Sequence, residues 1–229
     1  MIGIIIPLLQ EASVFKQKKT ATKVLVKISD NILLFVSGIG VNNATNAVEQ
    51  LAPKVTHLIS WGTAAGLSRD LEPGGLLLPD LVLDKNGTEY TTDPIFKNQI
   101  LKLLPSKLTY ESGLLCESTG ILKDAKEKET FGKKFNAVGC DMESATIAKL
   151  AKQRGISFNA IRVISDDYKT SIPKSVFSSI NEDGDFSIGQ FFLQLIQKPK
   201  DLIQIIRLRK NFSQAKKTMM VLKKALLKL

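Results

Sequence analysis

Three acidic side chains stand beside the ends of apolar runs, where they could act on one substrate. Glu11 and Asp166 each follow a short apolar run, and Glu143 lies at the start of a helical pattern. Strand ends of this kind meet at one rim of an α/β sheet, and ligands bind there, outside the carboxyl ends of the strands. Carboxylates with few basic neighbours suit a substrate that becomes cationic as it reacts.

Two glycine segments and one acidic segment have more than one interpretation. Ser37–Gly40 indicates a strand-to-helix turn with positive φ, and it lacks the full GxGxxG pattern of a dinucleotide site. Gly62–Gly66, which includes Thr63, offers backbone N–H groups and a hydroxyl to an anion or a sugar oxygen, but it also fits a tightly packed loop. Asp141 is a candidate helix cap, and Glu143 complements the helix dipole. The residues alone leave these alternatives open.

The chain alternates short apolar runs with helical patterns. The expected strands are Ile2–Ile6, Lys23–Ile28, Ile32–Val36, His57–Ser60, Leu76–Leu83, Leu108–Leu115 and Phe158–Ile164. The expected helices are Asn42–Leu51, Pro94–Leu104, Lys123–Lys134 and Glu143–Arg154. This order predicts an α/β domain in which helices cover a largely parallel sheet.

The composition excludes several classes of protein. A chain of 229 residues, 44% hydrophobic and 24% charged, can build one large core, so disorder and fibrous repeats are poor descriptions. No apolar run approaches the roughly 20 residues that cross a bilayer, and the first residues lack the features of a signal peptide. We therefore expect a cytoplasmic protein. Cys116 and Cys140 lack CxxC spacing and His57 is the single histidine, which favours neither a disulfide framework nor a zinc site.

The net charge of +10 is concentrated at the carboxyl end. Residues 189–229 contain ten Lys or Arg and one acid, so the rest of the chain is nearly neutral. We expect a body over residues 1–170 and a basic helical extension of the same domain over 171–229. Helical patterns in the extension are Ser187–Ile196, Lys200–Phe212 and Ser213–Lys228.

The basic extension has two interpretations, and its sequence argues against nucleic-acid binding. Its amphipathic helices either lie on anionic lipid or cover the core with their lysines in solvent. Nucleic acid is not expected as a partner, because the extension lacks the interleaved aromatic side chains that stack on bases.

Four motifs follow one another in a fixed order along the body. They are Ser37-Gly38-Ile39-Gly40 with Asn43-Ala44, Trp61-Gly62-Thr63-Ala64-Ala65-Gly66, Asp141-Met142-Glu143-Ser144-Ala145 and Arg162-Val163-Ile164-Ser165-Asp166. Together with Glu11 they resemble the purine nucleoside phosphorylase superfamily over residues 2–167, most closely its methylthioadenosine/S-adenosylhomocysteine nucleosidases. The resemblance implies a three-layer α/β/α fold with a central mixed, partly barrel-like sheet. It also implies cleavage of the N-glycosidic bond of a 5′-substituted adenosine, with release of adenine and no metal or redox cofactor.

The same resemblance implies a role for each acidic site residue. Glu11 corresponds to the acid that activates water. Asp166, with Ser165 beside it, corresponds to the group that serves the purine N7 and the exocyclic amine. Met142 would lie against the ribose, and the 2′- and 3′-hydroxyls of that sugar would donate hydrogen bonds to Glu143.

Four further positions and the assembly follow from the resemblance. Thr63 falls near the water or phosphate pocket, where it replaces a serine that is usual in the nucleosidases, and Gly62 beside it is a candidate substrate-binding residue. Ile121 and Leu122 border the adenine ring, and Ile121 stands where the family often carries an aromatic residue. A homodimer is expected, because neighbouring subunits of the family close the 5′ end of the site.

The chemistry of the bond agrees with these roles and leaves alternatives. Cleavage produces an electron-rich base, so Asp166 must carry a proton near neutrality, held there by burial or by a neighbouring acid, Asp167 or Glu143. A phosphorylase, with phosphate as co-substrate, needs guanidinium donors for that anion, and Arg69 alone is a plausible one. Hydrolysis is therefore favoured. A catalytically silent member that binds nucleoside or lipid is the alternative from another class.

A second resemblance concerns the chain after Asp167. Its proline, the turn at Asp183-Gly184, Lys198-Pro199 and the basic end are similar to the hopanoid-associated members of the superfamily. That similarity implies removal of adenine from adenosylhopane. It also predicts peripheral contact of residues 198–228 with the inner face of an anionic membrane. The sequence leaves the 5′ substituent of the substrate open.

Overall fold

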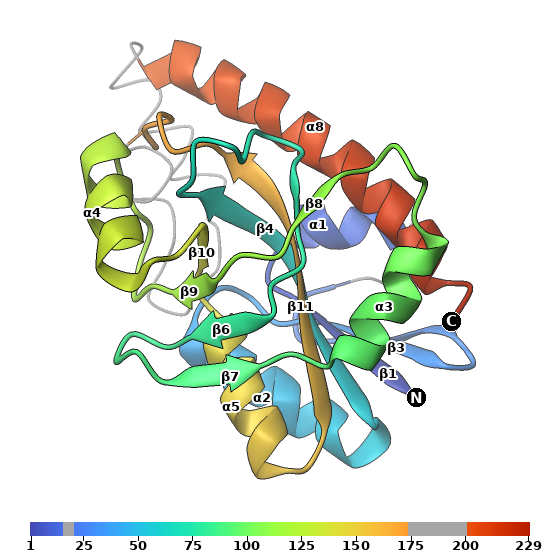
Figure 1. Cartoon of the computed structure of the whole chain (residues 1–229). Coiled ribbons are helices and arrows are strands. Elements are labelled where there is room, and N and C mark those ends of the chain that lie inside the picture. The colour runs from blue at the N-terminus through green and yellow to red at the C-terminus, as the bar shows by residue number, and fades with distance from the viewer. Residues whose placement is uncertain (16–20, 174–200) are drawn as a thin grey trace.

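A computed structural model describes residues 1–15, 21–173 and 201–229 (Figure 1). The predicted helix Ser187–Ile196, the turn at Asp183-Gly184 and the Lys198-Pro199 segment lie outside these residues. The predicted division into a body and a basic extension stays a prediction.

One mixed sheet forms the centre of the described structure. Its strands are β1 (Ile2–Ile6), β2 (Leu25–Ser29), β3 (Ile32–Val36), β4 (His57–Gly66), β5 (Leu76–Leu77), β6 (Leu81–Leu83), β7 (Glu89–Thr91), β8 (Tyr110–Glu111), β9 (Leu115–Glu117), β10 (Gly139–Asp141) and β11 (Ser157–Asp166). The main path runs β2-β3-β1-β4-β10-β9-β6-β7, and β11 connects β4 to a branch of β5 and β8. Parallel pairs such as β1–β4 occur beside antiparallel pairs such as β4–β10. The predicted mixed sheet is confirmed, and the sheet is not closed.

Helices cover both faces of this sheet, as Figure 1 shows. The α-helices are α1 (Leu9–Ala12), α2 (Val41–Leu51), α3 (Pro94–Leu103), α4 (Ala125–Phe135), α5 (Ser144–Gln153) and α8 (Asp201–Leu226), with 3-10 turns η1 (Ser13–Phe15) and η2 (Ala52–Lys54). One apolar core lies between the sheet and the pair α2 and α5. A second core lies between the opposite face and α3, α8 and η1. The predicted three-layer arrangement is confirmed.

Strands β4 and β11 carry several predicted site residues to the rim of the sheet. They pair in parallel from His57 beside Ser157 to Ala64 beside Ile164. The register then shifts before Asp166, and an irregularity of this kind redirects the side chains that follow it. The position of Asp166 therefore depends on a local break in the longest strand pair.

The motif Gly62–Gly66 lies within β4, which corrects the alternative of a loop at this position. Residues 65 and 66 pair with β10 while the same strand pairs with β11, so small side chains lie where β4 has strand neighbours at both edges. The predicted strand Leu76–Leu83 is interrupted at Pro79, which has no backbone N–H to donate to a partner strand. β7 and β10 are three residues long, too short for their periodicity to be recognised.

The two helical patterns predicted for residues 200–228 form one continuous helix, α8. Its second half buries Ala215, Met219, Leu222, Ala225 and Leu226 in the core. Its first turns expose apolar side chains, with Ile203 77% accessible. The second half of α8 therefore covers the core, with Lys217 and Lys224 exposed and Lys216 and Lys223 half-buried, which agrees with one of the two interpretations of the extension. No helix in the described parts of the chain is long and apolar enough to cross a membrane.

Two adjacent methionines test the packing of α8. Met219 is fully buried, whereas Met220 is 39% exposed. Replacing a buried methionine by alanine removes packed atoms and leaves a cavity, so Met219→Ala is expected to lower the free energy of unfolding by about 2–5 kcal/mol. Met220→Ala should change it by about 0.5 kcal/mol or less. Urea unfolding measures both, and equal losses would contradict the packing described.

Candidate active site

A cavity of about 390 Å³ opens at the carboxyl ends of the central strands and brings the predicted site together. Of the predicted site residues, Glu11, Thr63, Ile121, Leu122, Met142, Glu143, Ser165 and Asp166 line it. Further lining residues that the sequence did not assign to the site include Pro7, Leu8, Ser118, Leu208 and Phe212. Leu208 and Phe212 come from α8, and apolar positions in a long basic helix give no signal that distinguishes a cavity wall from core. The three acids that were expected at one rim share one cavity.

Glu11 of α1 is held by Thr63 of β4. Its side chain is buried, and Oε1 accepts hydrogen bonds from the backbone N–H and the hydroxyl of Thr63, both at 2.7 Å. Oε2 has no partner among the described residues. Burial raises the pKa of Glu11, although the Thr63 hydrogen bonds and the charge of Arg162 act against it. A carboxylate with a raised pKa and one unpartnered oxygen can take a proton from water.

Gly62 lies against Arg162 and Glu11, and its predicted part in substrate binding stays a prediction. A Cβ at this position would lie 2.5 Å from Nη1 of Arg162 and 2.9 Å from Oε2 of Glu11. Since both separations are shorter than real contacts, a side chain here would displace one of the two charged groups. Gly62 therefore serves the site by leaving room for Glu11.

Glu143 stands at the start of α5 and bridges to another helix. Its Oε1 accepts a hydrogen bond of 2.8 Å from the backbone N–H of Gly40, which precedes α2 and has φ of 93°. The glycine in the Ser37–Gly40 motif thus supplies a left-handed residue and a donor to the site. Burial, together with the nearby charges of Asp141 and Glu11, raises the pKa of Glu143 to about 8.

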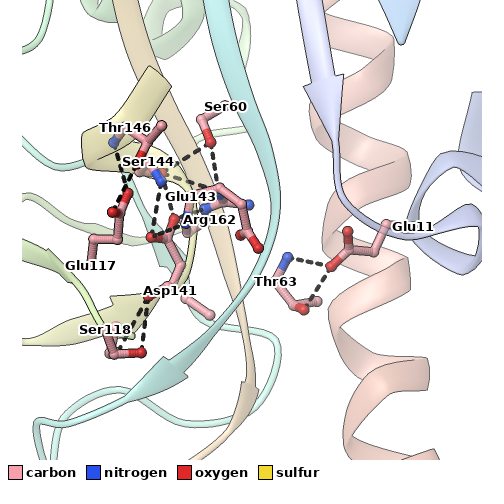
Figure 2. A network of polar contacts seen from close by, with 12 residues as sticks. Glu11, Ser60, Thr63, Glu117, Ser118, Asp141, Glu143, Ser144, Thr146 and Arg162 are labelled. Atoms are coloured by element: carbon pink, nitrogen blue, oxygen red, sulfur yellow. Dashed lines mark hydrogen bonds and ion pairs between the residues drawn. The ribbon is translucent and has the colours of Figure 1, made fainter. Parts of the chain in front are cut away.

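A buried guanidinium, that of Arg162, contacts Asp141 and two hydroxyls in a polar network (Figure 2). Nε of Arg162 lies 2.7 Å from Oδ2 of Asp141, and Nη2 donates to the hydroxyls of Ser60 and Ser144. Oδ1 of Asp141 accepts from the backbone N–H groups of Glu143 and Ser144. The N-cap position of α5, which one interpretation gave to Asp141, is occupied by Glu143. Asp141 instead fixes the backbone at the start of this helix through these two hydrogen bonds.

Asp166 has an unexpected neighbour. Its Oδ1 accepts a hydrogen bond of 2.8 Å from Ser165, and its Oδ2 lies 2.5 Å from the ammonium nitrogen of Lys128. The sequence suggested burial or a neighbouring acid, Asp167 or Glu143, as the influence on Asp166. Asp166 is buried, and the charged group in contact with it is a cation. Nothing in the sequence marked Lys128, because lysines are frequent throughout α4.

Other residues considered from the sequence lie away from the cavity wall. Trp61 fills the core, with its ring centroid 5.5 Å from that of Phe15. His57 is buried, and its Nε2 lies 2.9 Å from Oδ1 of Asn159. Arg69, the candidate for a phosphate donor, lies over the ring of Tyr168. Within the described residues, no group of three or more His, Cys, Asp or Glu side chains could hold a metal ion.

Comparison with known proteins agrees with this fold. The sequence model of the phosphorylase superfamily matches residues 3–187. A 5′-methylthioadenosine/S-adenosylhomocysteine nucleosidase from Buchnera aphidicola subsp. Baizongia pistaciae is 27% identical, over 94% of this chain and 92% of its own. The crystal structure of the Neisseria meningitidis 5′-methylthioadenosine/S-adenosylhomocysteine nucleosidase in complex with methylthio-immucillin-A is similar with a TM-score of 0.72 at 17% identity, covering 99% and 98% of the two chains. Futalosine hydrolase from Helicobacter pylori is similar with a TM-score of 0.67 at 15% identity, covering 97% of each chain.

The chain belongs to the phosphorylase superfamily, since the family match covers most of its length. The predicted superfamily and the expectation of an enzyme are confirmed. The structural likeness shows that the shared fold extends over nearly the whole chain.

The raised pKa of Glu143 predicts a pH-dependent stability. Between the ordinary value of 4.5 and about 8, the folded protein retains a proton that the unfolded chain has lost, so stability falls as pH rises through this window. Glu143→Gln does not titrate and retains an acceptor for Gly40. The free energy of unfolding of Glu143→Gln, relative to that of the wild type, should therefore increase from pH 5 to pH 9. Urea unfolding measures this difference. The exposed Glu49→Gln on α2 is the control, and a pH-independent difference for Glu143→Gln would contradict the prediction.

Proposed function

We propose that this protein hydrolyses the N-glycosidic bond of a 5′-substituted adenosine and releases adenine. The observation that supports this most strongly is the shared cavity of Glu11, Glu143 and Asp166. Three separate acids are what the bond requires: one for the leaving base, one for the sugar and one for water. The name of the Buchnera relative supports the same reaction.

In this mechanism, Asp166 donates a proton to the purine N7 as the bond between the sugar carbon and the base nitrogen breaks. The electron pair of that bond moves into the purine, and the sugar becomes an oxocarbenium-like cation. Glu143 accepts hydrogen bonds from the ribose 2′- and 3′-hydroxyls, and in its deprotonated form its charge stabilises the cation. Glu11 takes a proton from the water that attacks the sugar. The reaction needs no metal or redox cofactor.

Water rather than phosphate is favoured by the contents of the cavity. The backbone N–H and the hydroxyl of Thr63, which are suitable donors for an anion, already serve the carboxyl of Glu11. No Lys or Arg is among the described residues that line the cavity. A phosphate anion would therefore meet a buried acid without a basic side chain in that wall to balance it.

The apolar lining supports an apolar substituent at the 5′ position. Ile121, Leu122 and Met142 are proposed to border the adenine and the ribose, as the resemblance implies. Leu8 and Phe212 add further apolar wall, to which a methylthio group is suited. The alternative from the second resemblance is a larger apolar 5′ substituent, as in adenosylhopane.

Adenine release measured side by side tests the proposal. The substrates are methylthioadenosine, adenosylhomocysteine and an adenosylated lipid, each with and without phosphate. We expect adenine from at least one of them, with the free sugar as product in both conditions. Asp166→Asn should abolish release while the protein stays folded. A sugar 1-phosphate product would favour the phosphorylase, and nucleoside binding without adenine release would favour a catalytically silent member.

The raised pKa of Glu11 predicts the acid side of the pH profile. As a base, Glu11 acts when deprotonated, so kcat/KM should rise with pH around a value above the ordinary 4.5. Glu11→Gln should lose about 10²-fold or more in kcat and no longer show this acid limb. An unchanged profile in Glu11→Gln would remove Glu11 from the proposed role.

The predicted homodimer and the contact of residues 198–228 with an anionic membrane stay predictions. Among the described residues, the exposed apolar side chains at the start of α8 and the neighbouring Arg207 and Arg209 support a surface contact of this kind. Sedimentation and flotation with anionic vesicles at low salt test the two predictions, and a monomer that does not float would contradict both.

A further inference from the structure

One lysine of α4 is completely buried, and the proposed reaction does not use it. Lys128 is 0% exposed, and it is the sole buried residue of this helix. A buried ammonium is costly unless each of its protons has a partner. The position of Lys128 in an otherwise polar helix therefore calls for an explanation beyond packing.

All three protons of the Lys128 ammonium have acceptors at the end of β11 or on the segment that follows it. The nitrogen lies 2.7 Å from the carbonyl oxygen of Asp167, 2.9 Å from that of Thr170 and 2.5 Å from Oδ2 of Asp166. The segment is held in turn by the hydroxyl of Thr170, which donates to the side chain of Asp167 at 2.6 Å. Two carbonyl groups thus fix the ammonium, and its third proton is directed at Asp166.

This arrangement distinguishes the two oxygens of Asp166. An ammonium group only donates hydrogen bonds, so Oδ2 must be an acceptor whether or not Asp166 carries a proton. A proton on Asp166 therefore belongs on Oδ1. The hydroxyl of Ser165, which donates to Oδ1, also lies 3.5 Å from the carbonyl oxygen of Ala64 and can turn to that acceptor.

We propose that Lys128 is a positioning residue that keeps the proton of Asp166 on Oδ1 and stabilises the carboxylate formed when that proton is transferred to the base. This inference rests on the proposed function. In the step, the O–H bond of Asp166 breaks and an N–H bond forms at the purine N7. The electron pair of the O–H bond stays on the carboxyl group, beside the ammonium. Lys128 therefore favours the transfer without touching the substrate.

The other charged groups near Asp166 do not pair with its carboxyl group. Asp167 is adjacent, but its side chain is directed to Thr170 and lies 4.0 Å from Arg207 of α8. Glu143 and Glu11 line the same cavity from other elements. Among the described residues, Lys128 has the one cationic group with an ion pair to Asp166.

The inference is tested by comparing two leaving groups in Lys128→Met. With methylthioadenosine, kcat is expected to fall about tenfold or more, with KM changed by about twofold or less. With a 4-nitrophenyl 5-methylthioriboside, whose leaving group departs without a proton, kcat should change by about twofold or less. Lys133→Met, which removes an exposed lysine of the same helix paired with Glu129, should match the wild type on both substrates. Equal losses of Lys128→Met on both substrates would overturn the inference.

A second measurement does not depend on turnover. In protein labelled with ¹³C at aspartate carboxyls, the resonance of Asp166 is the one that Asp166→Asn lacks. Loss of the charged donor to Oδ2 should change the chemical shift of this resonance in Lys128→Met, whereas Lys133→Met should leave it unchanged. The same chemical shift in Lys128→Met and the wild type would overturn the inference, whether or not adenine is released. A changed chemical shift without adenine release from any substrate would contradict the proposed function alone.

Folding of the variant is checked by near-UV circular dichroism. Where Lys128→Met does not fold, Lys128→Gln is used for both measurements, because its amide keeps a donor without the charge. The expected results and the results that would overturn the inference are the same for both variants.

Discussion

The buried guanidinium of Arg162 is the interaction on which the candidate site depends. It pairs with Asp141 and donates to Ser60 and Ser144, so it connects β4, β10, β11 and α5 in one network. Asp141 in turn accepts a hydrogen bond from the backbone N–H of Glu143 at the start of α5. Removing one partner from a buried ion pair leaves an uncompensated charge and typically costs about 3–5 kcal/mol. A substitution of Arg162 would thus disturb the acids and the central sheet together.

Both buried cations of the described site stand behind acids and outside the cavity wall. Arg162 lies behind Asp141 and Glu143, and Lys128 lies behind Asp166. The surface offered to a ligand is therefore apolar with carboxyl groups and hydroxyls. Such a wall favours a cation that forms during a reaction, while the hidden cations keep the acids in place and limit their mutual repulsion.

Much of the fold was predictable because its elements have strong local patterns. β1 and β3 have the predicted bounds, and α2, α3, α4 and α5 differ from prediction by one or two residues at their ends. The errors occur where the local pattern is weak or misleading. The small residues of Gly62–Gly66 read as a loop, yet pairing with β10 and β11 makes them a strand.

The sequence by itself determined the alternation of strands and helices and the motifs that identify the superfamily, because apolar periodicity and glycine positions are local properties of a chain. It also singled out the acids that line the cavity. Only the tertiary structure decided that Gly62 lies against Arg162 and Glu11, that Leu208 and Phe212 of α8 form part of the cavity wall, and that Lys128 contacts Asp166. These relations join residues far apart in the chain, and a lysine in a basic helix looks the same in sequence whether it is solvated or buried against a carboxylate.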